Sequence, residues 1–167
     1  MSDAQPTWMM RHDVPDDPTL LAAPGRVALR HAHLDHILRM TIKTLGNVSV
    51  QEALDATAFE GSRTLRDRVR RLARRRLGEG TALIKLQAVL ERARRATEER
   101  NDLLHSPWGQ VVDGEMQIRT VDHQWKDLPT ASDLSALGVE IASITDELND
   151  ARLEGYIFEG LKSRPPR

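Results

Sequence analysis

Cysteine is absent from this 167-residue chain, which excludes disulfides and thiolate metal sites. Aromatic residues make up only 4% of the sequence, so the core must consist mainly of Leu, Ile, Val and Ala, a composition that favours helices over packed sheets. Long apolar runs are also missing, and the first residues are polar and acidic. We therefore expect neither a membrane-spanning segment nor a signal peptide, and we predict a cytoplasmic protein with one main domain.

Motifs that bind cofactors are missing as well. The sequence has no glycine-rich phosphate loop, no nucleophile elbow and no paired zinc-ligand motif, so we predict no metal and no cofactor. His31, His33 and His36 lie close together in sequence, but steps of two and three residues point them in three directions on a helix. One metal ion cannot collect them, and we expect them to be solvated or paired. Asp35, four residues after His31, is the natural partner for that histidine.

The net charge of −1 hides two segments of opposite sign. Residues 61–80 contain eight arginines and only two acidic residues, whereas residues 121–160 contain nine acidic and two basic residues. The arginine-rich segment predicts either non-specific binding to RNA phosphates or a solvated face whose charge complements that of the acidic segment. The RNA-binding interpretation assigns the contacts to Arg70, Arg71, Arg74 and Arg75.

Apolar periodicity and capping signals predict an all-α fold, a bundle of four to five helices with a small β-hairpin inserted before the last helix. Residues 1–24 are rich in proline and predict a flexible arm, residues 25–160 form the single domain, and residues 161–167 form a flexible tail. Capping boxes at Ser49–Glu52, Thr64–Asp67 and Thr130–Asp133 open three of the helices. The expected helices cover 26–45, a short stretch ended by Gly61, 64–77, 82–105 and 131–155, and the hairpin covers about 110–121.

The end of the helix predicted over 82–105 carries polar residues where apolar ones would continue its stripe. That stripe leads through Thr97 to Asn101, and Arg100 and His105 flank it on either side. Asn101 and His105 are four residues apart and can interact. Arg100 and His105 diverge by about 140° on an ideal helix, so they can converge only on something that lies across the helix end.

Arginine and histidine together suit a phosphate. Arginine binds a phosphate through a bidentate pair of N–H groups, and histidine exchanges a proton near neutral pH. Cleavage of RNA by its own 2′-hydroxyl needs a proton shuttle and positive charge for the developing phosphorane. The nucleophile then comes from the RNA, so no metal is required.

Arg100, followed by Asn101 and, after four intervening residues, by His105 at a helix end, resembles the signature of the HEPN superfamily. Many HEPN proteins are metal-independent endoribonucleases whose arginine–histidine motifs face each other across a dimer cleft, often in toxin–antitoxin or defence systems. The resemblance implies a homodimer that binds RNA, with a neutralising protein partner. It makes Arg100 and His105 catalytic, with Asn101 orienting the histidine and Asp35 and Trp108 supporting the motif.

Two other functions compete with this interpretation. Some HEPN proteins have lost catalysis, so the chain can equally be a non-catalytic dimeric helical module that regulates a partner, in which Arg100, Asn101 and His105 cap and brace a helix end. A third hypothesis is a basic nucleic-acid-binding module that uses the arginine-rich helix. It lacks the aromatic residues that would stack on bases.

Overall fold

A computed structural model describes residues 10–111, 114–120 and 122–163. Its first long helix, α1 (Pro18–Gly46), begins well before the predicted start at residue 26. The Asp17 carboxylate accepts hydrogen bonds from the N–H groups of Thr19 and Leu20, and a proline at the first helical position needs no N–H partner. The predicted flexible arm is therefore wrong for residues 18–24, and residues 1–9 lie outside the described part of the chain.

The next two helices follow the capping signals with one exception. α2 (Val50–Thr57) has the predicted Ser49–Glu52 capping box, and that prediction is confirmed. α3 (Ser62–Leu77) starts earlier than expected, because Gly61 takes the extended conformation of an N-cap residue. The Thr64–Asp67 box is wrong, since both residues already lie inside the helix.

The fourth helix, α4 (Thr81–His105), ends where Ser106 becomes extended before Pro107, as the sequence predicts. α5 (Ala131–Leu153) opens with the predicted Thr130–Asp133 capping box. A further helix, α6 (Tyr156–Lys162), follows it and buries Ile157 completely. The predicted flexible tail is therefore wrong for its first residues, and residues 164–167 lie outside the described ones.

The predicted hairpin is confirmed and belongs to a larger antiparallel sheet. Trp108 lies opposite Ile118 in the central pair of strands, and the residues of the expected Asp113–Gly114 turn are described only from Gly114 on. Two outer strands, which the sequence did not reveal, extend the sheet, one of them from the chain before α1. Two strands alone would be marginally stable, so the added strands strengthen the hairpin. The order along the sheet is β1 (Met10–Arg11), β2 (Trp108–Val111), β3 (Met116–Arg119) and β4 (Trp125–Asp127).

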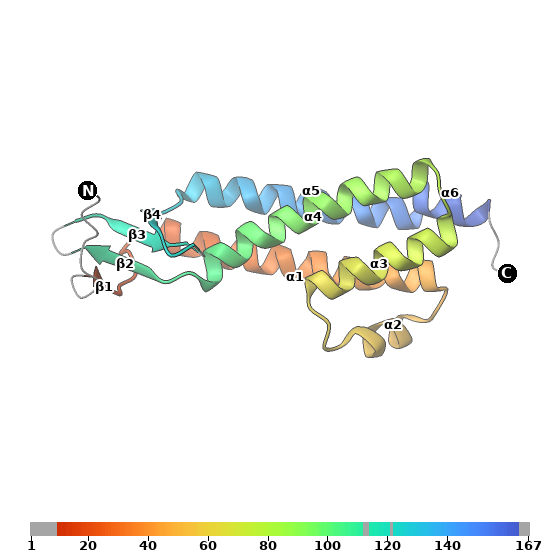
Figure 1. Ribbon diagram of the computed structural model, residues 1–167, viewed down its shortest axis with the longest axis horizontal. Helices are drawn as coiled ribbons and strands as arrows, with labels where there is room; N and C mark the ends of the chain where they lie inside the picture. Colours follow the sequence, from red (N-terminus) through yellow and green to blue (C-terminus); the bar gives the residue numbers. More distant parts are fainter. Residues whose placement is uncertain (1–9, 112–113, 121, 164–167) are drawn as a thin grey trace.

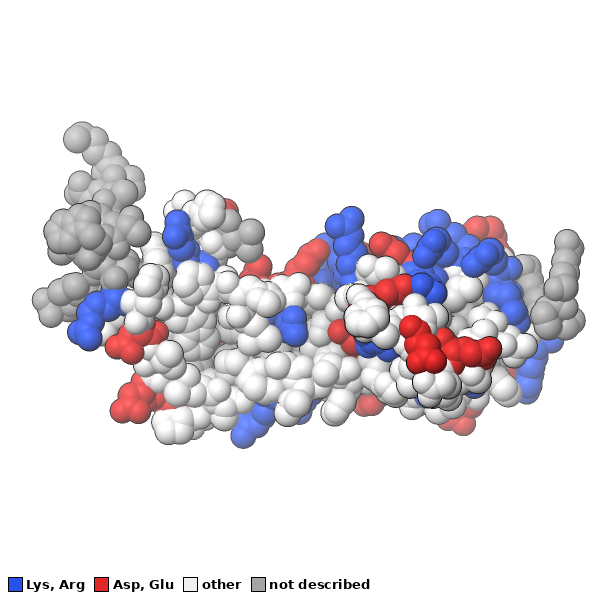
Figure 2. Space-filling model, turned by 90° about the horizontal axis from the view of Figure 1, so that it is seen from below, with Lys and Arg blue, Asp and Glu red and all other residues white. Residues whose placement is uncertain are grey.

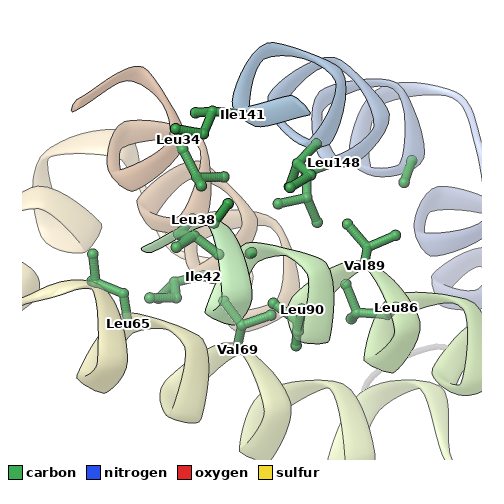
Figure 3. Close-up of a cluster of buried hydrophobic side chains, with 14 of the residues drawn as sticks. Leu34, Leu38, Ile42, Leu65, Val69, Leu86, Val89, Leu90, Ile141 and Leu148 are labelled. Carbon is green, nitrogen blue, oxygen red and sulfur yellow. The ribbon is translucent and has the colours of Figure 1, made fainter. Parts of the chain in front are cut away.

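The long helices lie side by side along the long axis of the molecule, with the sheet at one end and α6 at the other (Figure 1). The all-α bundle with a small sheet inserted before α5 is thus confirmed. The core lies between α1, α3, α4 and α5, where apolar side chains from all four helices meet (Figure 3). Its central members include Leu34, Leu38, Leu65, Val69, Leu86, Leu90, Ile141 and Leu148.

Two leucines of α5 allow the contribution of core burial to stability to be measured apart from that of helix propensity. Leu148 is fully buried, whereas Leu153 in the same helix is 53% exposed. We expect Leu148→Ala to lower the free energy of unfolding by about 2–5 kcal/mol, because it removes apolar contacts and leaves a cavity. Leu153→Ala should change it by less than about 1 kcal/mol. Denaturant titration measures both, and equal effects would contradict this core.

Candidate functional site

The last turns of α4 present the motif residues to two different environments. Arg100 and Asn101 are half-buried, and the Arg100 Nη1 donates a hydrogen bond to the Asn101 Oδ1 over 2.7 Å. His105 is exposed. Within one protomer the structure therefore pairs Arg100 with Asn101, and it turns the His105 imidazole toward solvent.

Arg100 faces a cluster of polar side chains buried between α1, α3 and α4. Thr97 lies at its centre, with its hydroxyl donating to the carbonyl of Ala93 over 2.7 Å. The same Oγ1 accepts a hydrogen bond from Arg66 Nη1 at 3.0 Å and lies 3.1 Å from His31 Nε2. The single hydroxyl proton is already used, so His31 must be the donor in that contact. The remaining ring nitrogen, Nδ1, lies 3.7 Å from the Asp35 carboxylate, too far for a hydrogen bond.

His31 is held neutral in this cluster. Burial lowers its pKa below 6.5, and the nearby guanidinium groups of Arg100 and Arg66 lower it further, against the opposing effect of Asp35. Only 2% of the side chain is exposed. Of the two predicted alternatives, solvated or paired, His31 is paired and lies beside Asp35, whereas His33 and His36 are exposed.

The cluster holds two guanidinium groups against one carboxylate. Arg66 is 6% exposed, and although burial lowers its pKa, a guanidinium remains charged. Asp35 Oδ1 and Arg100 Nε are buried without a hydrogen-bond partner among the described residues. Sequence reasoning missed Arg66, which looks like any other arginine of its helix. Thr97 is a polar residue within the apolar stripe of α4, and this position could have indicated a buried polar contact there.

His105 lies on the other side of the helix end and lines a groove of about 490 Å³. Asn101 and Ser106 line the same groove. Its other lining residues are Arg119, the last residue of β3, and Thr120 and His123 of the segment between β3 and β4. Sequence reasoning missed these residues, because the hairpin gave no indication of which side chains would face the helix end.

Trp108 does not line this groove. It is the first residue of β2, is half-buried and packs against the main core beside Leu103. The structure therefore places it between the sheet and the helices.

The predicted RNA-binding arginines lie on the exposed side of α3. Arg71, Arg74 and Arg75 are exposed, and Arg70 forms an ion pair with Asp67 at 2.7 Å. Lys and Arg side chains gather over the half of the molecule that contains α3 (Figure 2). The acidic side chains of α5 pair with an arginine of a different helix. Glu140 and Glu147 bind Arg92 of α4 at 2.8 and 2.6 Å.

Within the described ranges, no cluster of three His, Asp or Glu side chains is arranged to hold a metal ion. The helices described contain no segment with both the length and the apolar character needed to cross a bilayer. The chain matches no protein-family model, no curated protein and no solved structure.

The environment of His31 predicts how stability depends on pH. Its pKa is lowered in the folded protein, so the unfolded chain binds more protons below about pH 6.5 and stability falls as the pH drops through that value. His31→Gln keeps an N–H donor for Thr97 but does not titrate. We expect the wild-type free energy of unfolding to fall more steeply than that of the variant in this range. Parallel pH profiles would contradict a neutral, buried His31.

Proposed function

We propose that the protein is a metal-independent endoribonuclease of the HEPN type that acts as a homodimer. The observation that carries this proposal is the exposed imidazole of His105 in a polar groove at the end of α4. Histidine is suited to moving the protons of a phosphodiester cleavage. Asn101 lines the groove and accepts a hydrogen bond from Arg100, so it links the histidine side of the helix end to the arginine side.

In this reaction the RNA supplies its own nucleophile. The 2′-hydroxyl oxygen attacks the adjacent phosphorus, and the bond from phosphorus to the 5′-oxygen breaks. His105 shuttles the proton and Arg100 stabilises the charge on the phosphorane, so the products are a 2′,3′-cyclic phosphate and a 5′-hydroxyl.

The different surroundings of Arg100 and His105 support a homodimer. In one protomer, Arg100 lies beside the buried cluster around His31 while His105 faces the groove. A two-fold axis near the end of α4 would place the arginine of one protomer opposite the histidine of the other. We therefore expect the cleavage site to be shared between two copies of the chain.

The exposed arginines of α3 support an RNA substrate. α3 begins beside the buried cluster, where Arg66 bonds Thr97, and its later arginines continue along the surface away from it. They offer positive charge to the RNA backbone beyond the cleaved bond. The absence of cysteine fits a cytoplasmic enzyme, and the HEPN resemblance implies a toxin–antitoxin or defence system with a neutralising protein partner.

A second candidate function is a non-catalytic dimeric module. The half-buried position of Arg100 and its hydrogen bond to Asn101 favour it, because this side chain has a structural role whether or not RNA binds. In that case the motif braces the helix end, and the exposed arginines of α3 bind nucleic acid or a protein partner without cleavage.

Cleavage of RNA by the purified protein in EDTA separates these functions. We expect His105→Ala to lower the rate at least about 100-fold while leaving thermal unfolding unchanged, because the exposed imidazole contributes proton transfer and little packing. His33→Ala, which removes an exposed histidine on α1, is the matched control and should cleave like wild type. Absence of cleavage by a folded wild-type protein would reject the endoribonuclease in favour of the module.

Mixing two inactive variants tests the shared site. Arg100→Ala and His105→Ala should each be inactive alone, while mixed dimers contain one site with both wild-type residues. We expect the unfolded and refolded mixture to recover roughly a quarter of the wild-type rate, the value for random pairing in a two-site dimer. Recovery of no activity from correctly refolded dimers would place Arg100 and His105 of one protomer in the same site.

A further inference from the structure

We propose that the groove beside His105 holds the scissile phosphodiester, with Arg119 of the same protomer binding the phosphate and His123 acting as the second proton-transfer residue. This inference rests on the proposed endoribonuclease activity, but it does not depend on the dimer. It assigns a role in RNA cleavage to the inserted sheet.

The two walls of the groove bring complementary groups together. The end of α4 contributes His105 and Asn101, and the segment from β3 to β4 contributes Arg119 and His123. The groove is therefore lined by two imidazoles, one guanidinium, the carboxylate of Asp102 and neutral hydrogen-bonding groups. A cleavage that takes one proton from the 2′-hydroxyl and gives another to the leaving 5′-oxygen needs two proton-transfer groups and one anion-binding group.

Arg119 is fixed in place but keeps bonding capacity for a ligand. Its backbone N–H donates to the carbonyl of Pro107 over 3.0 Å, which anchors β3 against the segment that follows α4. Its side-chain Nε is buried without a hydrogen-bond partner, and Arg119 forms no ion pair with the described acidic residues. The Arg119 guanidinium lines the groove, and its terminal N–H groups fit the oxygens of a phosphodiester.

His123 lies in a tight turn whose backbone conformation does not require a histidine. The N–H of Thr120 donates to the carbonyl of Gln124 at 2.8 Å, and the N–H of His123 donates to the carbonyl of Thr120 at 2.9 Å. These bonds hold His123 at a φ of 64°, in the left-handed region. Glycine adopts this conformation at lower cost, so backbone geometry alone does not account for the imidazole. Non-glycine residues held in this region often serve a site.

The groove is lined by one acidic and one basic side chain besides its two imidazoles. Asp102 and Arg119 are its charged lining residues and they balance each other. Asp122, beside His123 in the turn, stays a carboxylate, because the Thr120 hydroxyl lowers its pKa. A phosphodiester anion adds one negative charge, and an imidazolium at His105 or His123 would balance it. That is the state in which one histidine acts as base and the other as acid.

The proposed step conserves atoms and charge. The neutral imidazole takes the proton of the 2′-hydroxyl as the bond from the 2′-oxygen to phosphorus forms. The imidazolium gives its proton to the 5′-oxygen as the bond from phosphorus to that oxygen breaks. Arg119 binds the non-bridging oxygens throughout, and the two histidines end with their protonation states exchanged.

The test compares an ordinary RNA with one that carries sulfur in place of the bridging 5′-oxygen at a single position. A thiolate leaves without a proton, so the second substrate does not need the general acid. The variants are His105→Asn and His123→Asn in the full-length protein, because asparagine tolerates a positive φ and does not titrate near neutral pH. His123→Gly relaxes the turn, and His36→Asn on α1 is the control outside the groove.

We expect His105→Asn, His123→Asn and His123→Gly each to slow cleavage of ordinary RNA at least about 100-fold, with unchanged thermal unfolding and no effect of His36→Asn. On the sulfur-containing substrate, the variants of one histidine should regain nearly the wild-type rate, which identifies the acid. If the wild type is active, two results would overturn this inference but not the endoribonuclease. One is full activity of His123→Gly, and the other is that neither histidine's variants regain activity on the sulfur-containing substrate. A wild type that cleaves neither substrate would reject the endoribonuclease itself.

Discussion

The hydroxyl of Thr97 is the point on which the geometry of the α4 end depends. It donates to its own helix at Ala93, and it accepts hydrogen bonds from His31 of α1 and Arg66 of α3. A buried polar group that loses its partner costs about 1–3 kcal/mol, so shifting any of the three helices along its axis is unfavourable. An apolar contact would tolerate such a shift more easily. This cluster therefore fixes the register of α4 one turn before Arg100.

That register gives the last turns of α4 two distinct sides. One side carries Arg100, near the buried cluster in which burial, together with the positive charges of Arg100 and Arg66, lowers the pKa of His31. The other side carries His105 and faces a groove that exists only because the sheet supplies its second wall. The helical core positions the helix end, and the backbone hydrogen bond from Arg119 to Pro107 positions the sheet against it. The chemistry that we propose for His105 would thus depend on both parts of the fold.

Much of the fold could be predicted from local signals. The stripe on α4, the boxes at Ser49 and Thr130, and the stop at Pro107 depend on neighbouring residues, and the structure contains them. The site was less accessible to sequence reasoning, because its contacts are distant along the chain. Nothing near Arg66 distinguishes it from the exposed arginines of α3, and nothing near His123 indicates that its turn lies against α4. Only the spacing of His31 and Asp35 pointed correctly to a contact.

The central claim is that the open side of the α4 end binds RNA. NMR spectra of the imidazole groups test it directly, because the six histidines are spread over the groove, the buried cluster, α1 and the segment before it. During titration with a 2′-deoxy oligonucleotide, which lacks the nucleophile, the ring signals of His105 and His123 should shift while those of His31, His33 and His36 stay in place. Shifts confined to the backbone amides of α3, with the signals of His105 and His123 unchanged at saturation, would contradict the account.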